Sequence, residues 1–118
     1  MKWKVEFHDD FYPEYIELGI RTQRELLLRI RLLQEFGPAL DRPYSDKLFG
    51  SEFSNMKELR FTVGRDVWRV AFAFDPERLA ILLVSGNKRG KDQKRFYKRL
   101  IRIADKRYKQ HLSNIENK

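Results

Sequence analysis

Residues 57–85 read KELRFTVGRDVWRVAFAFDPERLAILLVS, and this stretch decides the fold. Runs of branched and aromatic residues alternate in it with turn residues, which predicts three consecutive strands at about 57–63, 67–74 and 79–85. Short turns join them, so neighbouring strands are expected to pair antiparallel. The last strand is apolar throughout, which is typical of a central strand covered on both faces.

The first turn places two arginines together. Gly64-Arg65 is a two-residue hairpin loop with Gly first, and counting back from it pairs Arg60 directly with Arg69 on one face of the sheet. Their Cβ atoms are then about 4.5–5.5 Å apart, and like charges at that spacing repel. Either Glu58, which shares the face, bridges them, or an outside anion such as a phosphate binds both guanidinium groups.

Two helices precede this meander. Trp3, Val5 and Phe7 alternate with polar residues as a short strand. Asp9-Asp10 can cap a first helix that runs to about Leu18, and the next helix is expected to start at an N-cap on Thr22. Further patterns complete the chain: Gly37-Pro38 ends the second helix, 37–55 reads as a long loop, and a last helix starts near Asp92.

The predicted order is therefore β-α-α-β-β-β-α. It implies an α+β domain with a twisted, mainly antiparallel sheet and the helices packed on one face. A chain of 118 residues is expected to form a single domain, 1–118.

Composition excludes several classes of function. The chain has no cysteine, so thiol catalysis, disulfides and Cys-based zinc sites are excluded. The two histidines, His8 and His111, have no metal-ligand spacing, and we expect no cofactor and no metal. Apolar runs are too short for a membrane span and the N-terminus lacks an apolar signal segment, so a cytoplasmic protein is expected.

The positive charge is concentrated at one end. From Lys88 to Lys118, 12 Lys/Arg stand against 3 Asp/Glu, whereas the net charge of the whole chain is +8. A basic cluster of this kind binds polyanions such as RNA, although such a helix can also be a solvated face. The candidate RNA-binding residues are those on and around this cluster and the hairpin: Lys57, Arg65, Arg89, Lys91, Lys94, Arg95 and Lys98.

Residues for proton transfer are few. The segment 85–91, SGNKRGK, lacks the Ser or Thr that follows the lysine of a P-loop, which argues against ATP binding. Tyr97, early in the last helix, is the best candidate to move protons beside a cationic phosphate site. It can equally be a half-buried core aromatic.

Three motifs in order resemble the RelE/ParE toxin superfamily, in particular its HigB-like, phage Gp49-related branch. They are the Glu58-Leu59-Arg60 strand, the Arg69-Val70-Ala71-Phe72 strand, and the apolar strand that ends in Gly86-Asn87-Lys88. The segment from Leu33 to Pro43 and the helix around Arg95-Phe96-Tyr97 match the branch as well. The longer spacing from Lys88 to Tyr97 departs from RelE itself.

The resemblance implies a RelE-like fold and a type II toxin that cuts mRNA in the ribosomal A site, by attack of a ribose 2′-OH on the adjacent phosphate. It also implies neutralisation by a helix-turn-helix antitoxin of the HigA type, with DNA contacted only through that complex. Matched by motif, the catalytic residues are Arg60, Arg69, Lys88 and Tyr97. Two alternatives remain open: a ParE-like toxin that binds gyrase without nuclease chemistry, and a non-catalytic RNA-binding module.

Overall fold

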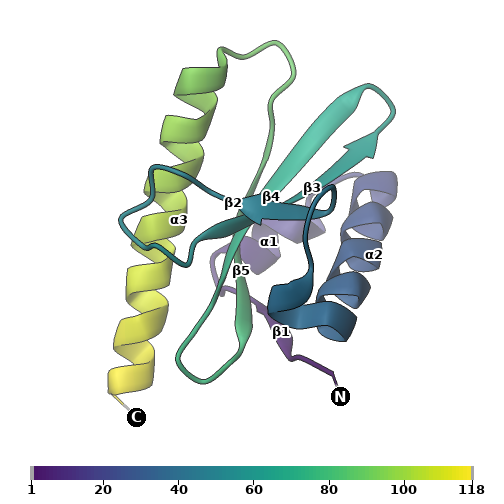
Figure 1. Cartoon of the computed structure of the whole chain (residues 1–118). Helices are drawn as coiled ribbons and strands as arrows, with labels where there is room; N and C mark the ends of the chain where they lie inside the picture. Colours follow the sequence, from purple (N-terminus) through teal and green to yellow (C-terminus); the bar gives the residue numbers. More distant parts are fainter. Residues whose placement is uncertain (1, 118) are drawn as a thin grey trace.

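The computed structural model describes residues 2–117, so Met1 and Lys118, the ends of the predicted domain, lie outside the described residues. Figure 1 shows the helices and strands in chain order. They are β1 (Val5–Phe7), α1 (Phe11–Ile16), α2 (Ile20–Phe36), the short 3-10 helix η1 (Gly37–Ala39), β2 (Ser45–Lys47), β3 (Lys57–Val63), β4 (Asp66–Phe74), β5 (Ala80–Asn87) and α3 (Gln93–Glu116).

One sheet organises the chain. Its strand order is β1-β5-β4-β3-β2, and every neighbouring pair is antiparallel except β1 with β5. This confirms the predicted α+β class with a mainly antiparallel sheet. It also confirms that the apolar strand is internal, because β5 has β1 on one edge and β4 on the other.

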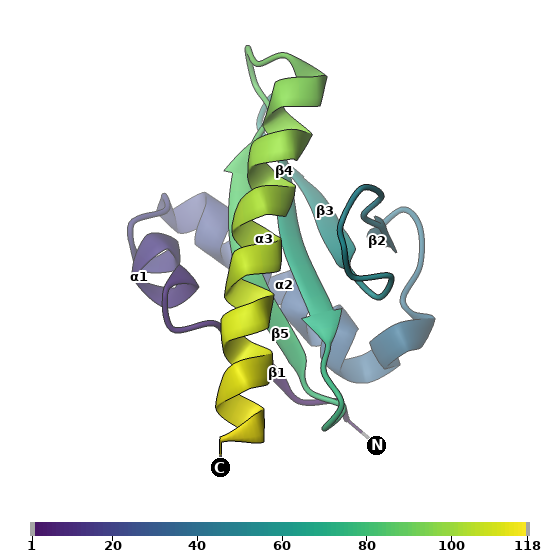
Figure 2. The same cartoon turned by 90° about the vertical axis from the view of Figure 1, so that its left-hand side faces the viewer.

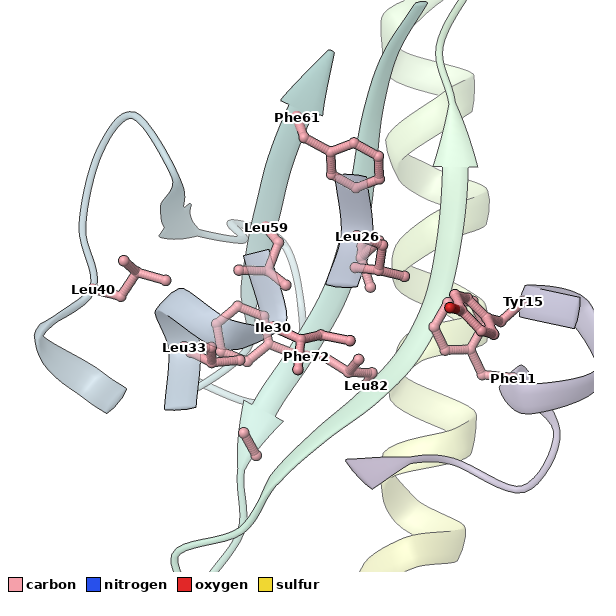
Figure 3. Close-up of a cluster of buried hydrophobic side chains, with 12 residues drawn as sticks. Phe11, Tyr15, Leu26, Ile30, Leu33, Leu40, Leu59, Phe61, Phe72 and Leu82 are labelled. Carbon is pink, nitrogen blue, oxygen red and sulfur yellow. The ribbon is translucent and has the colours of Figure 1, made fainter. Parts of the chain in front are cut away.

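The helices cover both faces of the sheet, which corrects the prediction that they pack on one face. Figure 2 shows α3 in front of the sheet, α2 behind it and α1 at its left-hand side, and α1 shares the core that α2 forms with the sheet. The side chains of β4 alternate accordingly: Phe72 packs with α1 and α2 in the core drawn in Figure 3, whereas Ala71 and Ala73 pack with α3. A helix with one apolar stripe does not indicate which face of the sheet it covers, so the sequence pattern of the helices left this undecided.

Two further predictions need correction. Helix α2 begins at Ile20 with Gly19 as its N-cap, and Thr22 is a buried residue inside the first turn. The side-chain amide of Gln23 holds the carbonyl groups at the corner between α1 and α2, which favours this earlier start. The segment 37–55, predicted as a loop, contains η1 and β2. The residues of β2 are all polar and have no alternating pattern that would have predicted a strand.

Close packing at Gly37 gives a stability prediction. Gly37 has φ +55°, and a Cβ placed there would lie 2.3 to 2.5 Å from the indole of Trp3. Gly37→Ala should therefore lower the free energy of unfolding by at least about 1–3 kcal/mol, the usual cost of a strained backbone. Gly19→Ala is the matched control, because nothing lies within 4 Å of its added Cβ. Urea unfolding of both variants tests this, and equal midpoints would contradict it.

Candidate functional site

The two arginines lie opposite each other, as predicted. Arg60 pairs with Arg69 in the register of β3 and β4, and both side chains leave the face that carries α3. Glu58 bridges them: its Oε2 accepts from Nε and Nη2 of Arg60 at 3.0 and 2.8 Å, and its Oε1 lies 3.8 Å from Nε of Arg69. An internal carboxylate therefore offsets the repulsion between the guanidinium groups.

Tyr97 completes this cluster from α3. Its hydroxyl donates to the Glu58 carboxylate, 3.1 Å from Oε1 and 3.3 Å from Oε2, and accepts from Nε of Arg69. Helix α3 approaches the sheet closely here because Gly86 has no side chain. A Cβ on Gly86 would lie 2.7 Å from the ring of Phe96, the neighbour of Tyr97.

The side chains of the cluster differ in their exposed fraction. The Glu58 side chain is 2% exposed and that of Arg69 is 12% exposed, whereas that of Arg60 is 40% exposed. Burial, followed by the negative charge of Glu58, raises the pKa of Tyr97 above that of a free tyrosine. At neutral pH the phenol thus keeps its proton, and that proton points at a carboxylate.

A cationic cavity adjoins the cluster. It has a volume of about 290 Å³, and its lining includes Arg65, Arg69, Lys88, Arg89 and Lys91. The Lys88 ammonium donates to Oε1 of Gln93 at 3.0 Å, so it is held at the start of α3. The structure brings Lys88 to the same cavity as Arg69, but it records no contact between Lys88 and Tyr97 within the described residues.

A second hollow adjoins the cluster at Tyr97. This cleft, of about 770 Å³, is lined by Tyr97, Lys94 and Lys98 of α3 and by Gly50 of the β2–β3 loop. Asp105 fastens that loop to α3, because its carboxylate accepts from Oγ of Ser51 at 2.5 Å and from the backbone of residue 52 at 3.1 Å. Because Lys94 and Lys98 line this cleft together with Tyr97, they border the cluster.

Two predicted RNA-binding residues lie elsewhere. Lys57 shares the opposite face of β3 with Leu59 and Phe61, which pack against α2. Arg95 borders a separate groove on the far side of α3 from Tyr97. The patterns that suggested them, a basic run and a strand end, carry no information on the direction of a side chain.

Sequence reasoning gave Glu58 only a bridging part and missed Asp46 altogether. Glu58 binds three members of the cluster and is its least exposed side chain. The sequence signal for Glu58 was a carboxylate two residues before an arginine on the same predicted strand. Asp46 lies 3.8 Å from Nη2 of Arg60, and no signal pointed to it because β2 itself was not predicted.

The raised pKa values predict loss of stability at alkaline pH. Burial is the first cause of the raised pKa of Tyr15, Tyr97 and Tyr108. The folded-state pKa of these phenols lies above the unfolded value near 10, so their contribution to the free energy of unfolding is complete below pH 10. That contribution is lost as pH rises through the folded-state pKa values. The urea midpoint of the wild-type protein should decrease from about pH 8 to pH 11, and the midpoint of Tyr97→Phe should decrease less steeply. A flat profile would contradict this.

Residues 2–117 offer neither a metal-binding cluster nor a membrane-spanning helix. They contain no group of three or more His, Asp or Glu side chains that could hold a metal ion. They also contain no helix of the length and apolarity that a bilayer span requires.

Sequence comparisons match the chain to toxins. The model of the family "Phage derived protein Gp49-like" matches residues 16–109. The Mycobacterium tuberculosis H37Rv protein named "Putative toxin HigB2" is 45% identical over 101 residues, which cover 85% of this chain and 50% of HigB2. "Putative toxin HigB3" of the same organism is 49% identical over 85 residues, which cover 72% of each chain. The chain thus spans half the length of HigB2.

A structural comparison matches the same kind of protein. A mutant of the Escherichia coli toxin RelE in the free state superposes with a TM-score of 0.62 and 14% sequence identity, over 86% of this chain and 97% of that one. At this identity the match bears on the fold, and the fold is RelE-like, as predicted.

Proposed function

The chain belongs to the Gp49-like family and is related to HigB3, and we propose that it is a type II toxin that cleaves mRNA on the ribosome. The observation that carries the proposal is the cluster Glu58, Arg60, Arg69 and Tyr97 on a sheet face beside a cationic cavity. Guanidinium groups bind phosphate, and the Tyr97–Glu58 hydrogen bond is a route for a proton.

The proposed reaction is an internal transfer of the phosphoryl group. The ribose 2′-oxygen attacks phosphorus while its proton passes to the Tyr97 oxygen and the phenol proton moves to Glu58. The bond from phosphorus to the 5′-oxygen breaks, and Lys88 supplies a proton to that oxygen. Products are a 2′,3′-cyclic phosphate and a 5′-hydroxyl end. Arg60 and Arg69 stabilise the charge that develops on the phosphate oxygens.

The partners follow from this function. We propose that mRNA in the ribosomal A site is the substrate and that a helix-turn-helix antitoxin of the HigA type holds the toxin inactive. DNA would be contacted only through the toxin–antitoxin complex. The RNA is proposed to run from the cavity lined by Arg65, Lys88 and Arg89 to the cleft bordered by Lys94 and Lys98, because Arg69 of the cluster lines the first hollow and Tyr97 lines the second.

Expression in bacteria without an antitoxin tests the proposed class of activity. We expect growth arrest and loss of intact mRNA, with DNA supercoiling unchanged. Intact mRNA together with gyrase-linked double-strand breaks would overturn the nuclease proposal in favour of a gyrase-binding toxin. Normal growth at a high level of folded protein would favour a non-catalytic RNA-binding module.

The position of the lysines on α3 predicts the salt dependence of binding. Each phosphate contact to a single strand contributes about 0.7 to the slope of log affinity against log salt. For binding to mRNA-programmed ribosomes, Lys94→Gln/Lys98→Gln should therefore reduce the magnitude of this slope by about 1.4. Arg95→Gln/Arg99→Gln, on the far side of α3, is the matched control with equal loss of charge. Equal slopes for the two double variants would contradict the proposed RNA path.

A further inference from the structure

The edge of β5 is open over its last residues. Strand β1 pairs only with Ala80–Leu82, and Figure 2 shows it beside the lower part of β5. On that edge the carbonyl of Leu83 accepts from Arg107 at 2.8 Å, and the carbonyl of Asn87 accepts from Lys91 at 3.0 Å. Between these two, nothing within residues 2–117 pairs with the edge of 84–86, although the other edge pairs with β4.

This open edge forms one wall of a groove. The groove has a volume of about 480 Å³ and lies between β5 and α3, on the side of α3 away from Tyr97. Its apolar lining comes from Val84, Phe96, Leu100 and Ile103. A free strand edge beside an apolar hollow is the arrangement that accepts an added strand, in which backbone hydrogen bonds give affinity and alternate side chains enter the hollow.

The rim of the groove is basic. Arg95 and Arg99 lie on its rim one helical turn apart in α3, Lys91 lies on the rim just before the helix begins, and all three are exposed. Within the described part of the chain, none of them forms an ion pair; the nearby Asp92 carboxylate is used as the N-cap, where it accepts from the Arg95 backbone at 3.1 Å. The charge on this rim is therefore available to a partner.

We propose that this groove binds an extended acidic segment of another protein, which adds a short strand to the open edge of β5. Apolar side chains of the segment enter the hollow, and acidic side chains meet the rim. A protein segment fits better than RNA, because a strand edge offers backbone groups in the spacing of another strand. The lining also includes one aromatic ring, Phe96, which is buried and offers no platform for stacked bases.

Selection from a displayed library of random octapeptides tests the proposal, with the full-length protein as bait. Enriched peptides should alternate apolar and acidic residues. A synthetic copy should bind at least tenfold more weakly to Arg95→Gln/Arg99→Gln, and normally to Lys94→Gln/Lys98→Gln. Hydrogen exchange of the Ser85 amide, which faces the open edge because the amides of Val84 and Gly86 face β4, should slow when it binds. Methylation of alternate peptide nitrogens should abolish binding, because strand addition needs these donors.

Several results would overturn the proposal. These are a library with no enrichment, enriched peptides without acidic residues, and peptides that bind the two double variants equally or tolerate nitrogen methylation. An oligouridylate that binds this groove with loss at Arg95→Gln/Arg99→Gln, where peptides do not bind, would identify an RNA site instead. The assay contains no ribosome and measures no cleavage, so its failure leaves the proposed nuclease activity standing, and the reverse also holds.

Discussion

Arg69→Ala is expected to lower the rate of mRNA cleavage by about 10²–10³ while the protein stays folded. Removal of one donor aimed at developing charge typically costs that much in rate. Arg69 also donates to the Tyr97 hydroxyl, so its loss leaves the phenol without its fixed orientation. The fold should survive because Arg60 still forms its ion pair with the buried Glu58. Single-turnover cleavage on programmed ribosomes measures the rate.

The control for this variant is Arg24→Ala, which removes an exposed arginine from α2. It should cleave at the wild-type rate. Circular dichroism and the melting temperature establish that Arg69→Ala is folded. Wild-type cleavage by folded Arg69→Ala would show that the arginine pair has no part in catalysis.

Glu58→Ala should have the largest effect on stability. It removes the carboxylate that bridges Arg60 and Arg69, so two guanidinium groups face each other across adjacent strands. Loss of one partner from a buried ion pair commonly costs about 3–5 kcal/mol. Urea unfolding at low salt should show a decrease of this order in the free energy of unfolding. Glu58→Gln, which keeps an acceptor but removes the charge, should show a smaller one.

A second substitution separates repulsion from lost packing. Glu58→Ala/Arg69→Ala removes the less exposed arginine as well, so part of the lost stability should return. Added salt should also reduce the deficit of Glu58→Ala, since it screens like charges. A Glu58→Ala variant as stable as the wild type would show that Glu58 does not hold the pair together.

The hairpin was predictable because its loop fixes the register. Gly64 adopts φ +60°, and counting from a two-residue loop places Arg60 opposite Arg69 without any knowledge of the rest of the fold. Strand β2 was not predictable in the same way. Its three polar residues have no alternation of their own and are extended only because they pair with β3.

The residue types of the site were predictable from the sequence. The group that compensates the charge of the two arginines was less predictable. The motifs pointed to Arg60, Arg69 and Tyr97, and the structure brings these three together around Glu58. A choice between an internal carboxylate and an outside phosphate depends on side-chain conformation, which the sequence does not specify. In the structure Glu58 holds the arginines, so an incoming phosphate has to compete with it.

In the proposed reaction the 2′-hydroxyl of mRNA attacks the adjacent phosphate at this cluster. The most direct test compares two mRNAs on purified programmed ribosomes, one all-ribose and one with a single 2′-deoxy residue at the mapped cleavage position. We expect the first mRNA to be cut to leave a 2′,3′-cyclic phosphate and a 5′-hydroxyl end, and the second not to be cut there. Cleavage of the 2′-deoxy mRNA at the same position, or no cleavage of the first by folded protein, would contradict it.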